Sequence, residues 1–294
     1  MRKKENIFTP SFSLHNRLLI VFASIIILLI ICIAINYKHF RTAANVDAVD
    51  NLSGQRIGTV VGWETDILLT GRDDLTLVRY DDNATAITAL GFNQIDAVGM
   101  DESTANYTLN LTSGLEQLPD PIAHIGMTML VPPDQDELCQ EISDYSAKFK
   151  TEDFYENFRS RALFENGETT FDFVDVGDAK NPTRTLRVGY VEENVQEGSY
   201  NNQTGRMEGY GVEFLERFAK DKGYALDWVQ CSDDSIEIMI QMGDLDIGLY
   251  LTTDVYRDAY EGEALLPDAY IEEDVYLLTL PDGNKLKMKG VIDM

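Results

Sequence analysis

Three short stretches decide the fold: TLRVGY at residues 185–190, GRMEGYGVEFL at 205–215 and GDLDI at 243–247. The first is an apolar run that predicts a strand. The second leads into residues 211–222, where apolar side chains recur at helical spacing until Gly223 ends the pattern. The third begins with a glycine and predicts another buried strand directly after it. Strands that alternate with helices predict parallel α/β structure with right-handed crossovers.

An earlier segment follows the same plan. Residues 55–62 and 75–80 predict strands, and residues 83–90 predict a helix that Asn83 caps and Gly91 ends. A buried strand follows at 95–99, after the same kind of glycine-to-aspartate step that precedes the strand at 245–249. The repeat is too irregular for a solenoid, so we expect two comparable α/β lobes. Between them, residues 136–164 predict helices, and the polar stretch 165–184 with its glycines and proline predicts a linker.

Composition narrows the function classes. The 294 residues carry a net charge of −26, which disfavours nucleic acid because that affinity comes from basic side chains on phosphates. Three cysteines and three histidines exclude a disulfide scaffold and disfavour a metal centre. The sequence has no P-loop, no nucleophile elbow and no histidine pair at metal-ligand spacing. We therefore expect no catalytic residues, no metal and no cofactor.

Residues 18–36 predict a transmembrane helix, because the run is uncharged and long enough to cross the hydrocarbon core. A cleaved signal peptide is the alternative, although its apolar region is usually shorter. The bases before the span favour a cytoplasmic segment 1–17 and an extracytoplasmic body on a single-pass cell-membrane anchor. In that body, Cys139 and Cys231 are either one disulfide or two separate thiols.

Both segments resemble the lobes of the amino-acid-binding family of bacterial extracytoplasmic solute-binding proteins, the bilobed "Venus flytrap" domains. In the second segment the resemblance rests on the strand at 186–190, the glycine-rich turn at 205–215, the GDLDI strand, the LTTDVYR loop at 251–257 and LPDAY at 266–270. In the first it rests on LSGQRIG at 52–58 and IDAVGMD at 95–101. Together these matches span about residues 50–280.

The resemblance implies an α/β fold of two periplasmic-binding-protein-like lobes with mixed, mainly parallel sheets. Residues 50–165 would form the first lobe, which resembles the family's second; residues 166–184 the linker; and residues 185–280 the second lobe, which resembles the family's first. This order is reversed relative to the family. A circularly rearranged single flytrap and the tail of one module joined to the head of another are both open, and the latter is typical of tandem receptor domains.

The same resemblance implies a binding site. Arg257 matches the arginine that holds the ligand carboxylate, and Thr252 would add a donor beside it. Asp101 matches the aspartate that holds the ligand ammonium, and Tyr200 lies where an aromatic ring covers the ligand. Each has a purely structural alternative: a surface ion pair for Arg257, a helix cap for Asp101 and a loop tyrosine for Tyr200.

Glu64 departs from the family. It lies in the turn Gly62–Thr65, where the family has small hydroxyl residues whose backbone donors hold a carboxylate. A glutamate there repels an anion. Glu64 therefore indicates a cationic solute, or a lobe that has lost binding.

The leading hypothesis is a membrane-anchored extracytoplasmic protein that binds a small polar solute, an amino acid or related amine, without catalysis. Its expected partners are the small-molecule ligand, the membrane through the N-terminal helix, and a permease or a signalling protein. The alternative is the ligand-sensing region of a transmembrane receptor whose output domain is absent from this chain.

Overall fold

The computed structural model describes residues 52–165, 167, 171, 182–192, 197–281 and 287–288. Their elements follow one another in this order: β1 (Arg56–Val60), α2 (Glu64–Leu69), β2 (Thr76–Tyr80), α3 (Asn83–Gly91), β3 (Ala97–Asp101), α4 (Glu102–Leu111), β4 (Thr112–Ser113), β5 (Glu116–Gln117), β6 (Ala123–Leu130), α5 (Asp136–Phe149), α6 (Tyr155–Ala162), β7 (Arg184–Val191), β8 (Ser199–Asn201), β9 (Arg206–Glu208), α7 (Tyr210–Lys222), β10 (Tyr224–Cys231), α8 (Asp233–Gln241), β11 (Ile247–Thr253), the 3-10 helix η2 (Asp254–Tyr256), β12 (Ile271–Thr279) and β13 (Lys287–Met288).

Nine of the described strands build one mixed sheet in the order β10-β7-β11-β6-β12-β3-β1-β2, with β5 beside β12, and β13-β4 and β8-β9 form two separate two-stranded sheets. Pairing is parallel at both ends of the sheet, among β1, β2 and β3 and among β7, β10 and β11. It is antiparallel in the middle, where β6 and β12 lie next to each other. The α/β class and the mixed sheet are as predicted, but the two α/β halves share one sheet.

The two ends of the sheet are built alike. In the first, Arg56 donates from its backbone and its guanidinium to Asp96 and from the guanidinium to the Gln94 carbonyl. In the second, Arg187 makes the same set of bonds to Asp246 and to the Gly243 carbonyl. The arginine lies in each half's first strand, β1 or β7, and the aspartate precedes the strand paired with it, β3 or β11. This shared motif gives a structural basis to the internal repeat that the sequence indicates.

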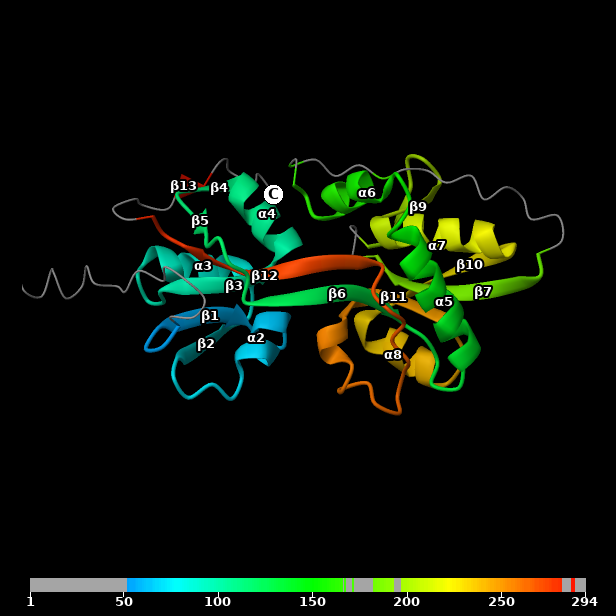
Figure 1. Ribbon diagram of the computed structural model, residues 1–294, viewed down its shortest axis with the longest axis horizontal. Coiled ribbons are helices and arrows are strands. Elements are labelled where there is room, and N and C mark those ends of the chain that lie inside the picture. The colour runs from blue at the N-terminus through cyan, green and yellow to red at the C-terminus, as the bar shows by residue number, and fades with distance from the viewer. Residues whose placement is uncertain are drawn as a thin grey trace, which may run out of the picture. The chain divides into compact units, whose positions relative to one another are not determined.

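Two connecting strands, β6 and β12, run antiparallel to each other through the middle of the sheet (Figure 1). The first half, β1 to β5 with α2 to α4, lies on the β3 side. The second half, α5 to α8 with β7 to β11 and η2, lies on the β11 side. β6 leads from the first half to the second and β12 leads back. Parallel strands need long crossovers, and each half supplies them as helices of its own.

Helices α5 and α6 pack in the second half. Their buried rings, Tyr145, Phe149 and Phe158, form one core with Val188 and Phe214. The Phe149 ring contacts several other aromatic rings, including that of Phe214, whose centroid lies 5.1 Å away. The expected first lobe, residues 50–165, includes α5 and α6, but their buried side chains belong to the hydrophobic core of the second half. The reason is that the apolar face of α5 finds its partner surface on α7 and β7.

Several local expectations change. Asp82 caps α3, because its side chain accepts the Thr85 backbone N–H at 2.7 Å, and Asn83 is the first helical residue. The strand at 245–249 extends to Thr253 as β11, and β12 was not predicted.

The predicted span 18–36 and the segment 1–17 lie outside the described residues. Within the described part of the chain, no helix has the length and apolar character needed to cross a bilayer.

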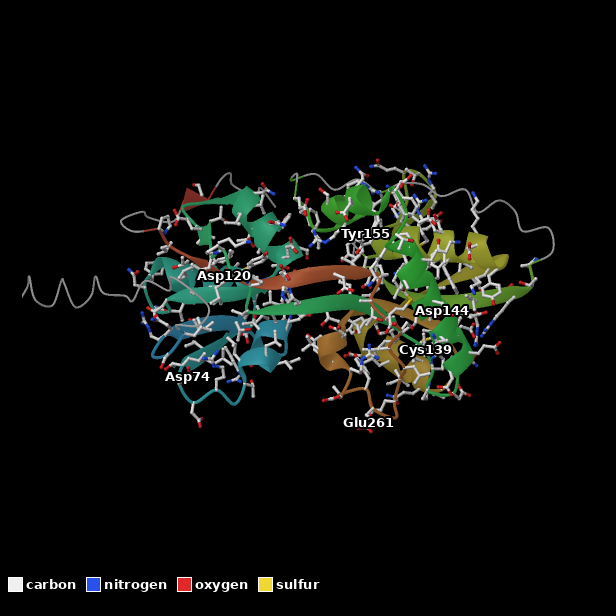
Figure 2. All side chains as sticks on the ribbon, viewed as in Figure 1. Asp74, Asp120, Cys139, Asp144, Tyr155 and Glu261 are labelled. Carbon is white, nitrogen blue, oxygen red and sulfur yellow. The ribbon has the colours of Figure 1, made fainter. Side chains whose placement is uncertain are left out.

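Cys139 and Cys231 are free, half-buried thiols, so the two-thiol interpretation describes this structure. Cys139 lies on α5 (Figure 2). Cys231 ends β10 and lies 3.8 Å from the Met239 sulfur. Burial raises the pKa of both thiols, which keeps them protonated and weakly reactive at neutral pH.

Candidate functional site

A carboxyl group lies buried in the middle of the sheet. Glu273 is on the connecting strand β12 opposite Ile125, and it is 3 % exposed. One of its oxygens accepts the Ser103 backbone N–H at 3.3 Å. Burial raises the pKa of Glu273 well above its ordinary value, and the neighbouring Asp101 and Glu64 carboxylates raise it further.

Asp101 ends β3 and caps α4. Its Oδ1 accepts the Thr104 backbone N–H at 2.8 Å and the Ser103 hydroxyl at 2.7 Å. The capping interpretation of Asp101 therefore holds in the structure. It does not remove the residue from the site, because the negative charge of Asp101 also acts on Glu273 and Glu64.

Glu64 opens α2, at the carboxyl end of β1. Its Oε1 lies 3.4 Å from the Thr253 hydroxyl and 3.5 Å from the Tyr256 hydroxyl, both in the second half. Tyr256 also donates to the Gly62 carbonyl at 3.0 Å. Burial and the Asp101 charge raise the pKa of Glu64 to about 7. A first-half carboxyl is thus held against the end of β11 and η2.

Glu197 holds the corresponding place in the second half, between β7 and α7. It is 1 % exposed, and its backbone carbonyl accepts the N–H groups of Gly211 and Val212 at the start of α7. Gly209 must be glycine here, since it has φ +146° and a Cβ would lie 2.3 Å from the Glu197 carbonyl oxygen. Burial raises the pKa of the Glu197 carboxyl to about 8.

Two buried phenols join these carboxyls. Tyr270 donates to Glu197 Oε1 at 3.4 Å and its ring stacks on Phe214. Tyr210, 3 % exposed, starts α7, and its pKa is raised well above the ordinary value by burial and by the charges of Glu197, Glu273 and Asp101. The residue after Tyr210, Gly211, donates its N–H to the Glu197 carbonyl, so Tyr210 lies beside Glu197. Within the described residues, neither the Tyr210 hydroxyl nor Glu197 Oε2 has a hydrogen-bond partner.

We call Glu64, Asp101, Glu197 and Glu273, with Tyr210 and Tyr270, the carboxyl cluster. The donors that reach its carboxyls within the described chain are neutral N–H and O–H groups. Glu102 differs, since it pairs with Arg159 at 2.9 Å. Among the described residues, no three His, Cys, Asp or Glu side chains are placed to hold a metal ion.

The halves also meet beside the cluster. Arg159 of α6 bonds Glu102 of α4, and one turn further along α4 the Asn106 amide donates to the Leu163 carbonyl at 2.8 Å. Next to them, the rings of Tyr107 and Phe164 meet edge to face at 5.7 Å. Because α4 starts at the cluster, these contacts tie the position of Asp101 to that of the second half.

The expected ligand loop lies at the end of β11, but different residues of it reach the cluster. Thr252 is buried and pairs across the sheet with Thr128. Arg257 is exposed, and its guanidinium donates to the Leu266 carbonyl at 2.7 Å. Glu64 is contacted instead by Thr253 and Tyr256, which were not among the expected ligand-binding residues.

Tyr200 lies apart from these contacts. It is on β8, paired with Met207 of β9, and is 42 % exposed. The structure thus brings Glu64 and Asp101 together and gives Arg257, Thr252 and Tyr200 other surroundings.

Replacing Arg257 by alanine should leave solute affinity within about threefold of wild type, because its guanidinium bonds a backbone carbonyl outside the cluster. The cost should appear in stability instead, at about 1 kcal/mol for one lost hydrogen bond. Titration calorimetry and thermal unfolding on the same preparations measure both. A tenfold or greater loss of affinity with unchanged stability would return Arg257 to the site.

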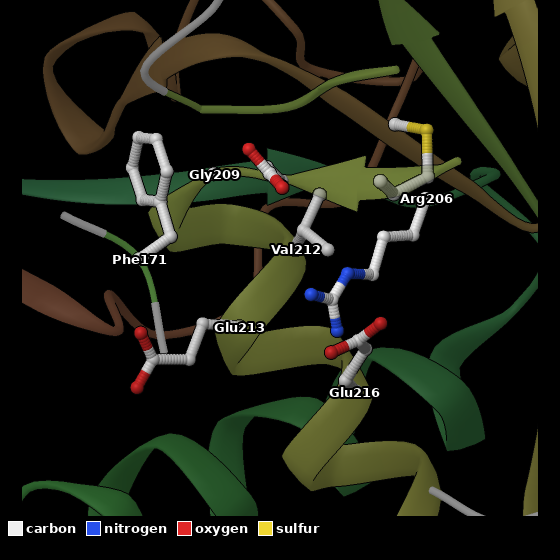
Figure 3. Close-up of a pocket in the computed structure, with 8 residues that line it drawn as sticks. Phe171, Arg206, Gly209, Val212, Glu213 and Glu216 are labelled. Carbon is white, nitrogen blue, oxygen red and sulfur yellow. The ribbon is translucent and has the colours of Figure 1, made fainter. Parts of the chain in front are cut away.

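A small hollow lies elsewhere, between β9 and the first turns of α7 (Figure 3). Its volume is about 40 Å3, and Arg206 and Glu216 extend toward each other across it. That space holds a few water molecules and no amino acid. We therefore place no ligand there.

Glu273, Glu197 and Tyr210 were missed from the sequence, and one signal was available for the first. Ile271, Glu273, Val275 and Leu277 alternate along β12, which puts one glutamate on the inward face of a strand. Such a position is rare for a charged residue without a partner, so it marks a candidate site. Nothing in the sequence brings Glu197 to this place, since its burial depends on the glycine turn before α7.

Comparison with known proteins gives a distant structural likeness. No family model and no curated protein matches the sequence. The fold is similar to a probable amino-acid ABC transporter extracellular-binding protein, ytmK, from Bacillus subtilis, at TM-score 0.38 and 10% identity over 79% of this chain and 86% of that one. It is also similar to a phosphate-binding protein of a phosphate ABC transporter from Streptococcus pneumoniae, at 0.36 and 11% over 79% and 90%, and to the VFT2 domain of BvgS from Bordetella pertussis, at 0.35 and 11% over 77% and 80%. The likeness concerns the periplasmic-binding-protein type of α/β fold, and the function proposed below rests on the residues of this chain.

Proposed function

We propose that this chain binds a small polar, amine-bearing solute between its two halves, without catalysis, as a membrane-anchored extracytoplasmic protein. The observation that carries the proposal is the carboxyl cluster. In it, Ser103 bonds both Glu273 of β12 and Asp101 of the first half, Glu64 reaches the second half at Thr253, and Tyr270 donates to Glu197 of the second half. Ligands of open α/β sheets sit beyond the carboxyl ends of the strands, and Glu64, Asp101 and Glu197 all follow such ends.

The two halves act in this proposal as one binding module whose parts follow an unusual order along the chain. Support comes from the shared sheet and from the connecting strands, which lead once in each direction between the halves. Such a pair of strands is suited to hinge closure around a solute. Transport and sensing both begin with closure of the module around its solute. The N-terminal anchor would keep the module at the membrane in either case.

A thermal-shift screen of the full-length protein against amines, amino acids and organic acids tests the proposal, because a ligand of the native state raises the unfolding temperature by mass action. We expect at least one amine to raise it, with saturation at one molecule per chain. Absence of any shift across all three classes would contradict solute binding.

A further inference from the structure

We propose that the carboxyl cluster selects an amine cation that has no carboxylate, and that a linear diamine such as 1,4-diaminobutane is its simplest form. This inference rests on the proposed function and names the class of its ligand. It follows from the charge of the cluster, from its unpartnered polar atoms and from its division into two ends.

Within the described residues, no Lys, Arg or His side chain bonds a carboxyl of the cluster. Ser103, Thr104, Thr253 and the tyrosines supply only neutral donors, and the charged groups that act on Glu273 are the carboxyls of Asp101, Glu64 and Glu102. Like charges confined in a site of low dielectric repel each other strongly. An ammonium among them relieves that repulsion and stabilises the ionised carboxyls.

The second observation is independent of charge. Glu197 Oε2 and the Tyr210 hydroxyl are more than nine-tenths buried and lack a partner within the described chain. A buried polar group left unpaired costs on the order of 1–3 kcal/mol, so a partner is expected. Tyr210 lies beside Glu197 in the chain fold, because its neighbour Gly211 donates its N–H to the Glu197 carbonyl and its neighbour Gly209 packs against the same carbonyl. An ammonium donates to such oxygens, and the Tyr210 and Tyr270 rings add faces that attract a cation.

A ligand carboxylate has no place in this arrangement. It would have to lie near Glu64, Asp101 or Glu197, and each of these is already a carboxyl. Arg257, the residue expected to hold it, bonds the Leu266 carbonyl. Arg159 is bound to Glu102 and Glu165. The cluster therefore repels the group that defines an amino acid while it attracts the amine.

The cluster has two acidic ends. At the first-half end, Ser103 bonds Glu273 with its N–H and Asp101 with its hydroxyl, and the charges of Asp101 and Glu64 act on Glu273. Glu197, whose Oε1 accepts from the Tyr270 hydroxyl at 3.4 Å, forms the second-half end. The charges of Glu197 at one end and of Glu273 and Asp101 at the other both act on the Tyr210 hydroxyl. Two separated acidic ends match two ammonium groups on one chain, and a ligand that contacts both would hold the halves together.

The test is calorimetric titration of the full-length protein at pH 8 with four compounds of similar length: 1,4-diaminobutane, 1-aminobutane, ornithine and 4-aminobutanoate. We expect the diamine to bind at least tenfold more tightly than ornithine, which adds a carboxylate to the same diamine. 1-Aminobutane should bind more weakly than the diamine, and 4-aminobutanoate most weakly.

Two results would overturn the inference. Ornithine or 4-aminobutanoate binding as tightly as the diamine would show that a carboxylate is accepted, and it would leave solute binding itself intact. Calcium or magnesium chloride that displaces the diamine at equimolar concentration would show a cation site without selection for amines. If none of the four compounds binds while another solute from the thermal-shift screen does, the inference fails and the proposed function stands.

Discussion

Glutamine in place of Glu273 should weaken binding of 1,4-diaminobutane about a hundredfold at pH 8. Glutamine has the shape of protonated glutamic acid but cannot ionise, so the variant loses the charge that an ammonium needs at the first-half end of the cluster. Removing one partner of a buried charge pair costs on the order of 2–5 kcal/mol, which a hundredfold loss matches at its lower end. Calorimetric titration of the full-length variant measures the loss.

Glu272→Gln is the matched control. Glu272 precedes Glu273 on β12 but points to the other face, where it is exposed and pairs with Lys150. The same chemical change at this position should leave affinity within about twofold of wild type. Equal losses in both variants would mean that the general negative charge of the protein, rather than the cluster, attracts the diamine.

Glutamine in place of Glu197 should stabilise the ligand-free protein at alkaline pH. Burial raises the folded-state pKa of Glu197 to about 8, whereas the unfolded chain has the ordinary value near 4.5. Between these values the folded state binds more protons than the unfolded state, so wild-type stability falls as pH rises from about 4.5 to 8. The variant has no such proton to lose. We expect a gain on the order of 2–4 kcal/mol at pH 8.5 and little change at pH 4.5.

Urea unfolding at both pH values measures this gain. Glu261→Gln, on an exposed turn (Figure 2), is the control and should change stability by less than about 0.5 kcal/mol at either pH. A variant that is less stable than wild type at pH 8.5, with an unaltered control, would contradict the raised pKa of the buried Glu197 carboxyl.

Much of the fold could be predicted because its elements carry local signals. Glycines end α7 and α3, and the apolar spacing of α7 is regular. The repeated glycine-to-aspartate steps correspond to the Arg56–Asp96 and Arg187–Asp246 motifs. These signals lie within one half each, so the sequence indicates two similar halves without indicating their junction.

The junction could not be predicted because its determinants are far apart in the chain. β6 and β12 pair across about 150 residues, and Glu273 interrupts the apolar alternation that would mark β12 as a buried strand. Likewise, Ser103 and Glu273 meet only once the sheet has formed. Asp101 and Glu64 were found through the resemblance, whereas Glu197 and Tyr210 come together through the turn at Gly209.

The most direct measurement of the central claim is the number of protons released when the full-length protein binds 1,4-diaminobutane at pH 7. Calorimetric titration in two buffers of different ionisation enthalpy gives this number. The cluster holds protonated carboxyls at that pH, on Glu197 with a pKa of about 8 and on Glu64 with a pKa of about 7, and an ammonium requires them ionised. We therefore predict one diamine per chain, roughly one proton or more released, and an affinity that rises with pH. Binding without proton release, or with proton uptake, would contradict a cation site built from carboxyls of both halves.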